Sequence, residues 1–346
     1  MQPGPLSNVI SQTILCEKNG LDSAWYPDHF IGGRPESIWP ELFTSLTLMG
    51  INTSRIMIGS AATDSLRRHP AAIAQSLATI DSAIDGRAAL GIGAGEAMNL
   101  TPYGISTRNL YRKLREAIQV IKLLWTSDHI KPATLRGDFY NLDEAFLQIK
   151  PARNPHPPIY VGAFGPKMLH MTGELADGWM PFSLTPEAYK RCLNGPIRAG
   201  TEKAGRSLSD IEPAFLPPTV ISKSHDQAKN EIERAAKRFL VLLPDVLRII
   251  APKVKHPGRP FTLAYWMGRL RKEDMELISQ IADQIPTELA LRTVIWGTPD
   301  DCIEQIEKFA EAGCCHFIFG IRSKQPDETI RLIGKEIVSY FKEGLR

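Results

Sequence analysis

A carboxylate and an imidazole stand next to each other in the segment "AWYPDHF", residues 24–30. Apolar and aromatic residues lead up to Asp28 and His29, as they would in a buried strand that ends at this pair. The ordinary pKa of histidine lies close to neutral pH, so His29 could exchange a proton with a substrate. A histidine at a strand end is also often a hydrogen-bonded structural residue, and the segment alone leaves both interpretations open.

A second carboxylate, Glu96, closes the glycine-rich segment "GIGAGE", residues 91–96. Glycines let the backbone approach a planar or phosphorylated ligand closely, and they also suit a tight turn with positive φ. An imidazole and a carboxylate at neighbouring strand ends would suit proton transfer to or from a bound substrate. We therefore predict His29 and Glu96 as the catalytic residues. The pattern supplies no third ligand of matching type, so no metal site is predicted.

Helix and strand signals alternate along the chain and indicate how these residues are positioned. Strand-like segments separated by helical ones imply an α/β protein with a parallel sheet buried on both faces. The segment 108–125 is the clearest amphipathic helix, and Thr298, Pro299, Asp301 and Gly313 mark the limits of another. The expected strands lie at residues 23–29, 55–63, 88–95, 158–165, 178–182, 213–221 and 314–320.

Seven strands are one short of a (β/α)8 TIM barrel, which we predict as the fold, with a doubly wound open sheet as the alternative. In a barrel, residues at the carboxyl ends of the strands line the active site. This rule selects Asp28 and His29, residues 60–64, 93–99 and 162–165, and Phe182.

The composition limits the classes of protein that the chain can belong to. It has 346 residues, 43% hydrophobic and 23% charged, which is typical of a globular protein. A net charge of +3 without runs of like charge gives no reason to expect nucleic acid as a partner. The most apolar segment, residues 239–251, is too short to span a membrane.

The same data bear on location and domain organisation. Five cysteines without a CxxC spacing, and a start without the pattern of a signal peptide, predict a cytoplasmic protein. We treat residues 1–346 as a single barrel domain, in which residues 223–290 form a mostly helical insertion before the last strand.

Five segments carry a resemblance to a known family. They are "PDHF", "GSAATDSLRRHP", "GRAALGIGAGEAMNLTPYGI", "PIYVGAFGPKMLHMTGELADGW" and "WGTPDDCIEQIEKFAEAG". In this order they resemble the luciferase-like (LLM class) oxidoreductases, and within them the branch that uses the 5-deazaflavin coenzyme F420. The chain is similar in character to phthiodiolone ketoreductase-like and methylenetetrahydromethanopterin reductase-like members. The resemblance implies a bacterial luciferase-like TIM barrel, a homodimer, and a deazaflavin ring in the mouth of the barrel.

The resemblance also implies roles for residues at matching positions. His29 would face the coenzyme ring and the substrate, and Ala61 and Ala62 fall where members commonly hold a non-prolyl cis peptide. Phe164, Gly165 and Lys167 match the segment that holds the phosphate tail of the coenzyme. The complete set of predicted coenzyme-binding residues is Asp28, Ala61, Ala62, Asp64, Ala94, Gly95, Asn99, Phe164, Gly165, Lys167 and Met168.

These expectations combine into a predicted function. The protein would transfer a hydride between coenzyme F420 and a small organic substrate: a carbonyl, an imine or a pterin-bound one-carbon unit. His29 and Glu96 would handle the proton. An FMN-dependent luciferase-like monooxygenase and a non-catalytic coenzyme-binding barrel are the alternatives that the sequence leaves open.

Several features depart from the family. Phe182 and Thr185 stand where the sugar-phosphate dehydrogenases use threonine and lysine for the substrate phosphate, so a phosphorylated sugar is not expected as the substrate. The departure at the N-terminus is the more serious one. Members begin with a strand before the helix that we place at residues 8–18, and residues 1–6 are too few to form it. We therefore expect seven barrel strands with a gap between the strand leading to His29 and the last strand. An upstream start of the natural chain or an open seam in the barrel would each account for this departure.

Overall fold

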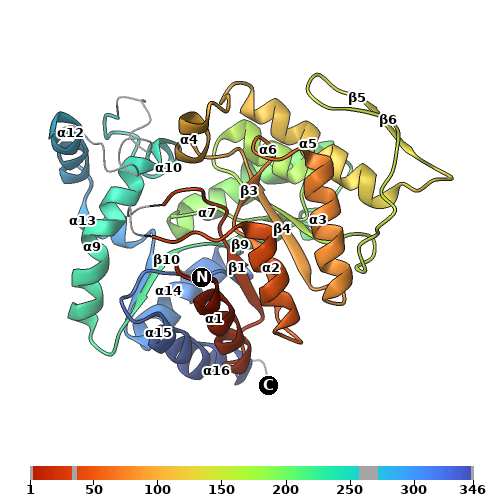
Figure 1. Ribbon diagram of the computed structural model, residues 1–346. Helices are drawn as coiled ribbons and strands as arrows, with labels where there is room; N and C mark the ends of the chain where they lie inside the picture. Colours follow the sequence, from red (N-terminus) through yellow and green to blue (C-terminus); the bar gives the residue numbers. More distant parts are fainter. Residues whose placement is uncertain (1–2, 33–36, 257–271, 344–346) are drawn as a thin grey trace.

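The computed structural model describes residues 3–32, 37–256 and 272–343. Its centre is a curled parallel sheet whose strands alternate with helices along the chain (Figure 1). The strands lie in the order β1-β2-β4-β7-β8-β9-β12, and the short β3 pairs with β4. Their bounds are β1 (Ser23–Tyr26), β2 (Met57–Ser60), β3 (Thr63–Asp64), β4 (Ala88–Gly93), β7 (Ile159–Gly162), β8 (Gly178–Trp179), β9 (Glu212–Phe215) and β12 (His316–Phe317).

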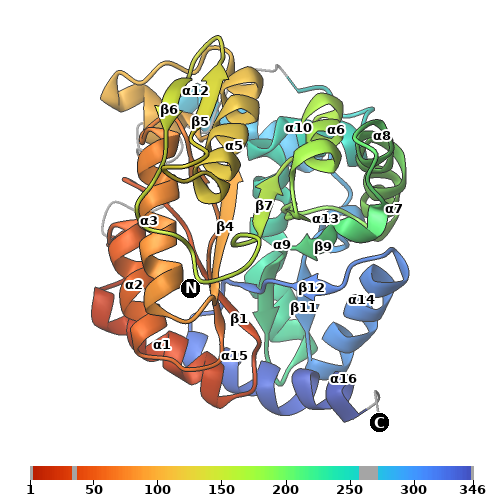
Figure 2. The same ribbon diagram turned by 90° about the vertical axis from the view of Figure 1, so that its right-hand side faces the viewer.

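Within this main sheet the strand order follows the chain without a reversal. A doubly wound sheet reverses its order at a switch point, so the observed order confirms the predicted α/β barrel and excludes the open-sheet alternative. Figure 2 shows β4 and β7 side by side at the centre of the molecule. Five consecutive residues of β4 are buried, because helices cover the outer face of the sheet and side chains fill its inner face.

The covering helices form where the sequence has a wide apolar face. In α5 (Leu110–Thr126), the buried residues Leu114, Ala117, Ile121 and Leu124 lie on one side, as the periodicity predicts. In α14 (Pro299–Glu311), Thr298 and Asp301 form the predicted capping box. α1 (Leu6–Lys18) precedes β1, and the other helices that follow strands are α2 (Leu42–Ile51), α3 (Pro70–Ala83), α4 (Ala97–Leu100), α6 (Pro166–Leu175), α7 (Pro186–Cys192), α8 (Arg198–Lys203), α15 (Pro326–Leu332) and α16 (Ser339–Glu343).

Two parts of the structure extend beyond the simple alternation. A hairpin of β5 (Ala133–Arg136) and β6 (Asn141–Ala145), which the sequence analysis did not predict, projects at the upper right of Figure 1. Within residues 223–290, described helices alternate with short non-helical segments such as residues 251–256. The helices are α9 (His225–Leu242), α10 (Pro244–Ile250), α12 (Lys272–Asp283) and α13 (Thr287–Leu291).

The last two long strands are each interrupted rather than continuous. After β9 the chain passes Pro217 and resumes as β10 (Pro218–Ile221), and β12 resumes as β13 (Gly320–Ile321). Proline has no backbone N–H to donate, so consecutive prolines break the ladder. Beyond the break, β10 lies between β11 (Ile295–Gly297) and β13.

A small hydrophobic cluster fills the interior of the barrel. Its buried members come from all round the sheet, which is the arrangement of an inner side-chain layer. Glycines make room for its two largest rings: a Cβ on Gly59 would overlap Trp25, and a Cβ on Gly178 would overlap Tyr160. The cluster consists of Trp25, Ala89, Tyr160, Met180, Ala214 and Ile318.

β1 and β12 are the two ends of the strand order. The sequence predicted a gap between these two strands, and the ends of the sheet lie at this place. Side chains span the space between them. The hydroxyl of Ser23 on β1 lies 2.7 Å from Nε2 of His316 on β12, and Nδ1 of His316 lies 2.6 Å from Oε1 of Glu212. Trp25 donates its indole N–H to the same hydroxyl at 2.9 Å. A polar network therefore connects the two edges of the sheet.

The length and apolar character of the helices bear on whether the chain could cross a membrane. None of those within residues 3–32, 37–256 and 272–343 is long and apolar enough to cross a bilayer.

The seam network predicts a specific effect on stability. We expect His316→Ala to lower the free energy of unfolding by about 1–3 kcal/mol, because Ser23 and Glu212 both lose a partly buried hydrogen-bond partner. Urea denaturation followed by circular dichroism measures the effect. His129→Ala, at an exposed loop position, is the matched control and should leave stability within about 0.5 kcal/mol. An unchanged unfolding midpoint for His316→Ala would show that the network does not hold the seam.

Candidate active site

The sequence-predicted histidine lies where the loops after β1 and β4 meet. Asn99 Nδ2 lies 2.9 Å from Nδ1 of His29 and 3.4 Å from Oε2 of Glu96. Nδ1 of His29 and Oε2 of Glu96 are 3.6 Å apart. The structure thus brings His29, Glu96 and Asn99 together as one constellation.

The hydrogen bonds of Asn99 define which nitrogen of His29 carries the proton. Oδ1 of Asn99 accepts the backbone N–H of Phe30 at 2.8 Å, which fixes the orientation of the amide. Its NH2 group therefore faces His29 and can only donate. Nδ1 of the neutral imidazole must then accept, and Nε2 carries the hydrogen.

The surroundings of His29 favour its neutral form. Burial lowers the pKa of His29 most, and the positive charges of Arg67 and Arg322 lower it further. The carboxylates of Glu96 and Asp28 act in the opposite direction and raise this pKa, but the net shift is downward. The side chain of His29 is 19% exposed and that of Glu96 is 60% exposed, so the carboxylate lies on the solvent side of the imidazole.

One buried arginine, Arg67, contacts both Asp28 and Asp64, and Nη1 of Arg68 also lies 2.6 Å from Oδ2 of Asp28. Nε of Arg67 lies 2.6 Å from Oδ2 of Asp64, and its Nη2 lies 3.0 Å from Oδ2 of Asp28. The same Nη2 donates to the carbonyl oxygen of Asp28 at 2.9 Å, and Thr63 donates to Oδ2 of Asp28 at 2.7 Å. Both predicted coenzyme-binding carboxylates are thus engaged in tying the β1 and β3 loops together.

A surface with few side chains lies at the carboxyl ends of β2, β4 and β7. Gly93 and Gly162 are partners in the ladder, and a Cβ on either would meet only one backbone oxygen at 3.8 Å. The peptide bond between Ala61 and Ala62 is cis, as the resemblance implied. Both alanines pack on the interior cluster below them. A flat ring could lie on such a surface, because no side chain would project through it.

Other predicted coenzyme-binding residues lie on the loops after β4 and β7. Gly95 has a φ of +85° and packs against Leu66 and Leu100, so it serves a tight turn. Ala94 beside it is half-buried. Gly165 is the residue before α6 and has open space at its Cβ position, and Lys167 in the first turn is exposed.

Phe164 and Met168 on the same loop pack against the main hydrophobic core. The whole segment 164–168 lies at the same edge of the sheet as His29, because the strands are parallel. Contact of these residues with a coenzyme stays a prediction.

Sequence reasoning missed three residues of this site. The ring of Trp39 packs edge-on against His29 with centroids 4.7 Å apart, and its indole N–H is buried without a partner among the described residues. Arg67 lay inside a motif that we quoted without a role. Arg322 directly follows β13, so the strand-end rule could have selected it. No local pattern in the sequence indicated Trp39.

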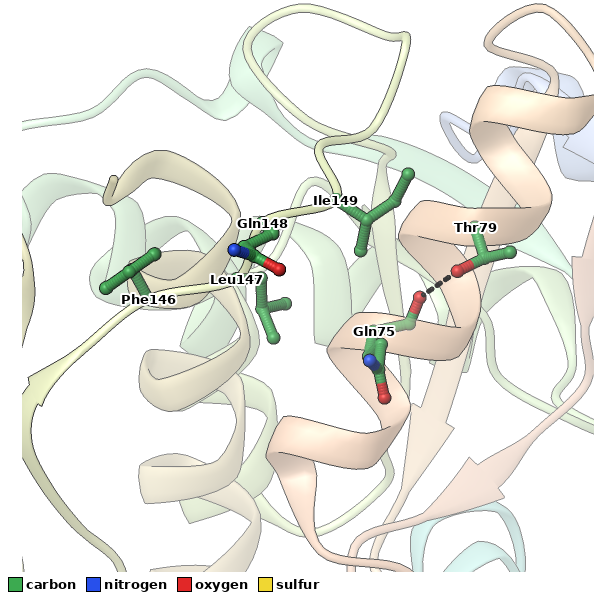
Figure 3. Close-up of a pocket in the computed structure, with 6 residues that line it drawn as sticks. All are labelled: Gln75, Thr79, Phe146, Leu147, Gln148 and Ile149. Carbon is green, nitrogen blue, oxygen red and sulfur yellow. Dashed lines mark hydrogen bonds between the residues drawn. The ribbon is translucent and has the colours of Figure 1, made fainter. Parts of the chain in front are cut away.

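An open hollow elsewhere on the molecule contains none of the predicted site residues. It lies between α3 and the segment after β6 (Figure 3). Its lining residues are Gln75, Thr79, Phe146, Leu147, Gln148 and Ile149. Within the described part of the chain, no group of three or more His, Cys, Asp or Glu residues is arranged to hold a metal ion.

The structure thus combines an α/β barrel, an oriented histidine and a surface with few side chains at its strand ends. The chain belongs to the luciferase-like monooxygenase family, whose sequence model matches residues 1–316. This membership confirms the resemblance drawn from the ordered motifs.

Curated relatives and a solved structure extend this finding. The F420-dependent glucose-6-phosphate dehydrogenase of Nakamurella multipartita is 29% identical over 344 residues, covering 97% of this chain and 93% of the relative. The 5,10-methylenetetrahydromethanopterin reductase of Archaeoglobus fulgidus is also 29% identical, covering 95% and 94%. A structure of an F420-dependent secondary alcohol dehydrogenase in complex with an F420-acetone adduct matches with a TM-score of 0.77 at 25% identity, covering 98% and 96%. The dehydrogenase and the reductase are equally identical in sequence to this chain, so sequence identity does not favour one of these two named activities over the other.

The role of Asn99 can be tested without any ligand. Asn99→Asp keeps the acceptor for the Phe30 N–H but places a carboxylate beside Nδ1 of His29. We expect the pKa of His29 to rise by about one to three units, because a nearby negative charge favours the imidazolium. NMR titration of histidine-labelled protein measures this pKa, with His29→Ala to assign the signal. Asn141→Asp, on the exposed hairpin, should leave the titration unchanged. An unshifted His29 in Asn99→Asp would contradict the hydrogen bond.

Proposed function

We propose that the protein is an F420-dependent oxidoreductase that transfers a hydride between the deazaflavin and a small organic substrate. The observation that carries the proposal is the orientation of His29 by Asn99 beside the surface formed by Ala61, Ala62, Gly93 and Gly162. The names of the relatives, which include two F420-dependent activities, support the same choice of coenzyme.

The residues present fit a planar coenzyme. Gly93 and Gly162 leave the space that a ring would need, and the exposed Lys167 at the start of α6 would hold a phosphate. When bound, a deazaflavin supplies hydride chemistry with little reactivity toward oxygen. The protein's own contribution is to position the substrate, exclude water and manage one proton.

His29 and Glu96 divide the handling of the proton. Neutral His29 presents its Nε2–H to a substrate oxygen, where it stabilises charge as the oxygen gains electrons. Nδ1 cannot take a proton without losing the Asn99 contact, so Asn99 keeps the imidazole neutral. Glu96, mostly exposed, tunes the pKa of His29 through its charge and connects the site with solvent.

The experiment that tests the proposal compares coenzymes directly. Purified protein is titrated with F420 and with FMN, and binding is followed by tryptophan fluorescence. We expect F420 to bind at least about tenfold more tightly than FMN. The bound protein should then reduce or oxidise the coenzyme with at least one member of a panel of ketones, secondary alcohols, imines and a methylene-pterin.

Two other outcomes would overturn the proposal. Tighter binding of FMN with oxygen consumption would favour the luciferase-like monooxygenase. F420 binding without turnover of any substrate in the panel would favour a coenzyme-binding barrel.

The proton-handling residues give a further prediction. His29→Ala should lower kcat roughly 10²–10³-fold, the range for loss of a hydrogen-bond donor to a developing oxyanion, with little change in coenzyme affinity. Glu96→Gln removes a charge that raises the pKa of His29, so this pKa falls further. The acidic limb of the pH–rate profile should therefore move to lower pH. Glu202→Gln, exposed on α8, should leave the profile in place. A limb that stays fixed in Glu96→Gln would remove Glu96 from the proposed role.

The homodimer and the cytoplasmic location belong to the same proposal. Both rest on the resemblance and on composition, and both stay predictions. Sedimentation of the purified protein would test the dimer.

A further inference from the structure

Arg322 stands at the carboxyl end of the last strand, in a position that the proposed chemistry does not use. Its backbone N–H donates to the carbonyl oxygen of Thr219 at 2.8 Å, which anchors it beside β10. Its side chain is exposed, and no hydrogen bond or ion pair joins its guanidinium to the described residues. Arginines in such surroundings are normally matched by an anion.

The wall beside Arg322 is aromatic. The guanidinium carbon lies 5.3 Å from the ring centre of Phe239 on α9. Phe239 packs edge-on against Phe182, with ring centres 5.6 Å apart. Phe182 follows β8 and bridges to Leu216, so all of these residues lie at the edge of the sheet that carries His29. The stacking restricts the guanidinium and leaves its N–H groups available.

Electrostatics connect Arg322 with the catalytic histidine. Protein atoms surround Arg322 closely enough to lower its own pKa by desolvation, although its side chain reaches solvent. The charge of Arg322 also lowers the pKa of His29, with Arg67 acting in the same direction and Glu96 and Asp28 opposing both. Arg322 therefore lies within electrostatic range of the site.

We propose that Arg322 binds an anionic group, a carboxylate or a phosphate, carried by the substrate, with Phe239 and Phe182 as the apolar wall beside it. The proposal rests on the proposed function, because the anion belongs to the molecule that His29 acts on. A guanidinium binds a carboxylate or phosphate through two parallel hydrogen bonds, which would fix the direction in which the substrate enters. Arg322 is thus a specificity-determining residue.

The test uses benzoate, an aromatic anion, and benzamide, a neutral molecule of nearly the same shape. Binding of each is measured by calorimetry to the coenzyme-free and to the F420-loaded protein. We expect benzoate to bind at least about tenfold more tightly than benzamide, and Arg322→Gln to abolish this preference. Arg331→Gln removes the same charge from an exposed position on α15 and should keep the preference. Arg322→Lys keeps the charge and should retain part of it.

A second readout depends on no ligand. Arg322→Gln removes a charge that lowers the pKa of His29, so this pKa should rise, the opposite of the shift in Glu96→Gln. Circular dichroism confirms that each variant is folded. An unchanged His29 titration in folded Arg322→Gln would show that the guanidinium does not face the site, and would overturn the proposal.

The remaining outcomes distinguish an anionic group of the substrate from the anionic tail of the coenzyme. F420 affinity should change by no more than about twofold in Arg322→Gln. A large loss of F420 affinity, together with competition between F420 and benzoate, would assign Arg322 to the coenzyme's own anionic tail and overturn the substrate assignment. A benzoate preference that survives Arg322→Gln would also overturn it. Failure of F420 to bind, with benzoate preference intact and dependent on Arg322, would reject the proposed function and leave the anion site standing.

Discussion

The position of the site depends on one buried guanidinium. Arg67 is 2% exposed and lies between the carboxylates of Asp28 and Asp64, which are 3% and 2% exposed. Asp28 has a second partner in Arg68, so removal of Arg67 would leave the buried carboxylate of Asp64 without this cation, and breaking a buried ion pair in this way costs about 3–5 kcal/mol. The arrangement fixes the loop after β1 against the loop after β3. Because His29 directly follows Asp28, the same contacts determine where the imidazole lies.

The barrel supports this arrangement without a continuous ring of hydrogen-bonded strands. The ends of the sheet, β1 and β12, are connected through Ser23, His316 and Glu212, while Trp25 and Tyr160 fill the interior. The site residues lie on the loops after β1 and β4, two strands that only β2 separates in the sheet order. The constellation around His29 therefore forms within the continuous part of the sheet and does not need the seam to be closed.

Charges of both signs act on His29, and burial decides between them. Glu96 and Asp28 favour the imidazolium, whereas Arg67, Arg322 and above all desolvation favour the neutral ring. A neutral ring with a hydrogen on Nε2 can donate to a substrate oxygen at neutral pH. The hydrogen bond from Asn99 selects this tautomer, so the electrostatic balance and the hydrogen-bond geometry act in the same direction.

The sequence by itself determined the features that depend on neighbouring residues. Alternating helix and strand patterns predicted the barrel, the ends of its strands predicted Asp28, His29, Glu96 and Asn99, and five ordered motifs predicted the family. The tertiary structure alone decided which of these side chains meet and in what state. Asn99 and His29 are 70 positions apart, and Arg67 reaches Asp28 across 39. Trp39 and Arg322 could not be selected with the same certainty, because their relation to His29 depends on contacts between distant segments. The desolvation that lowers the pKa of His29 also depends on these contacts, which form when the sheet curls and brings its strand ends together.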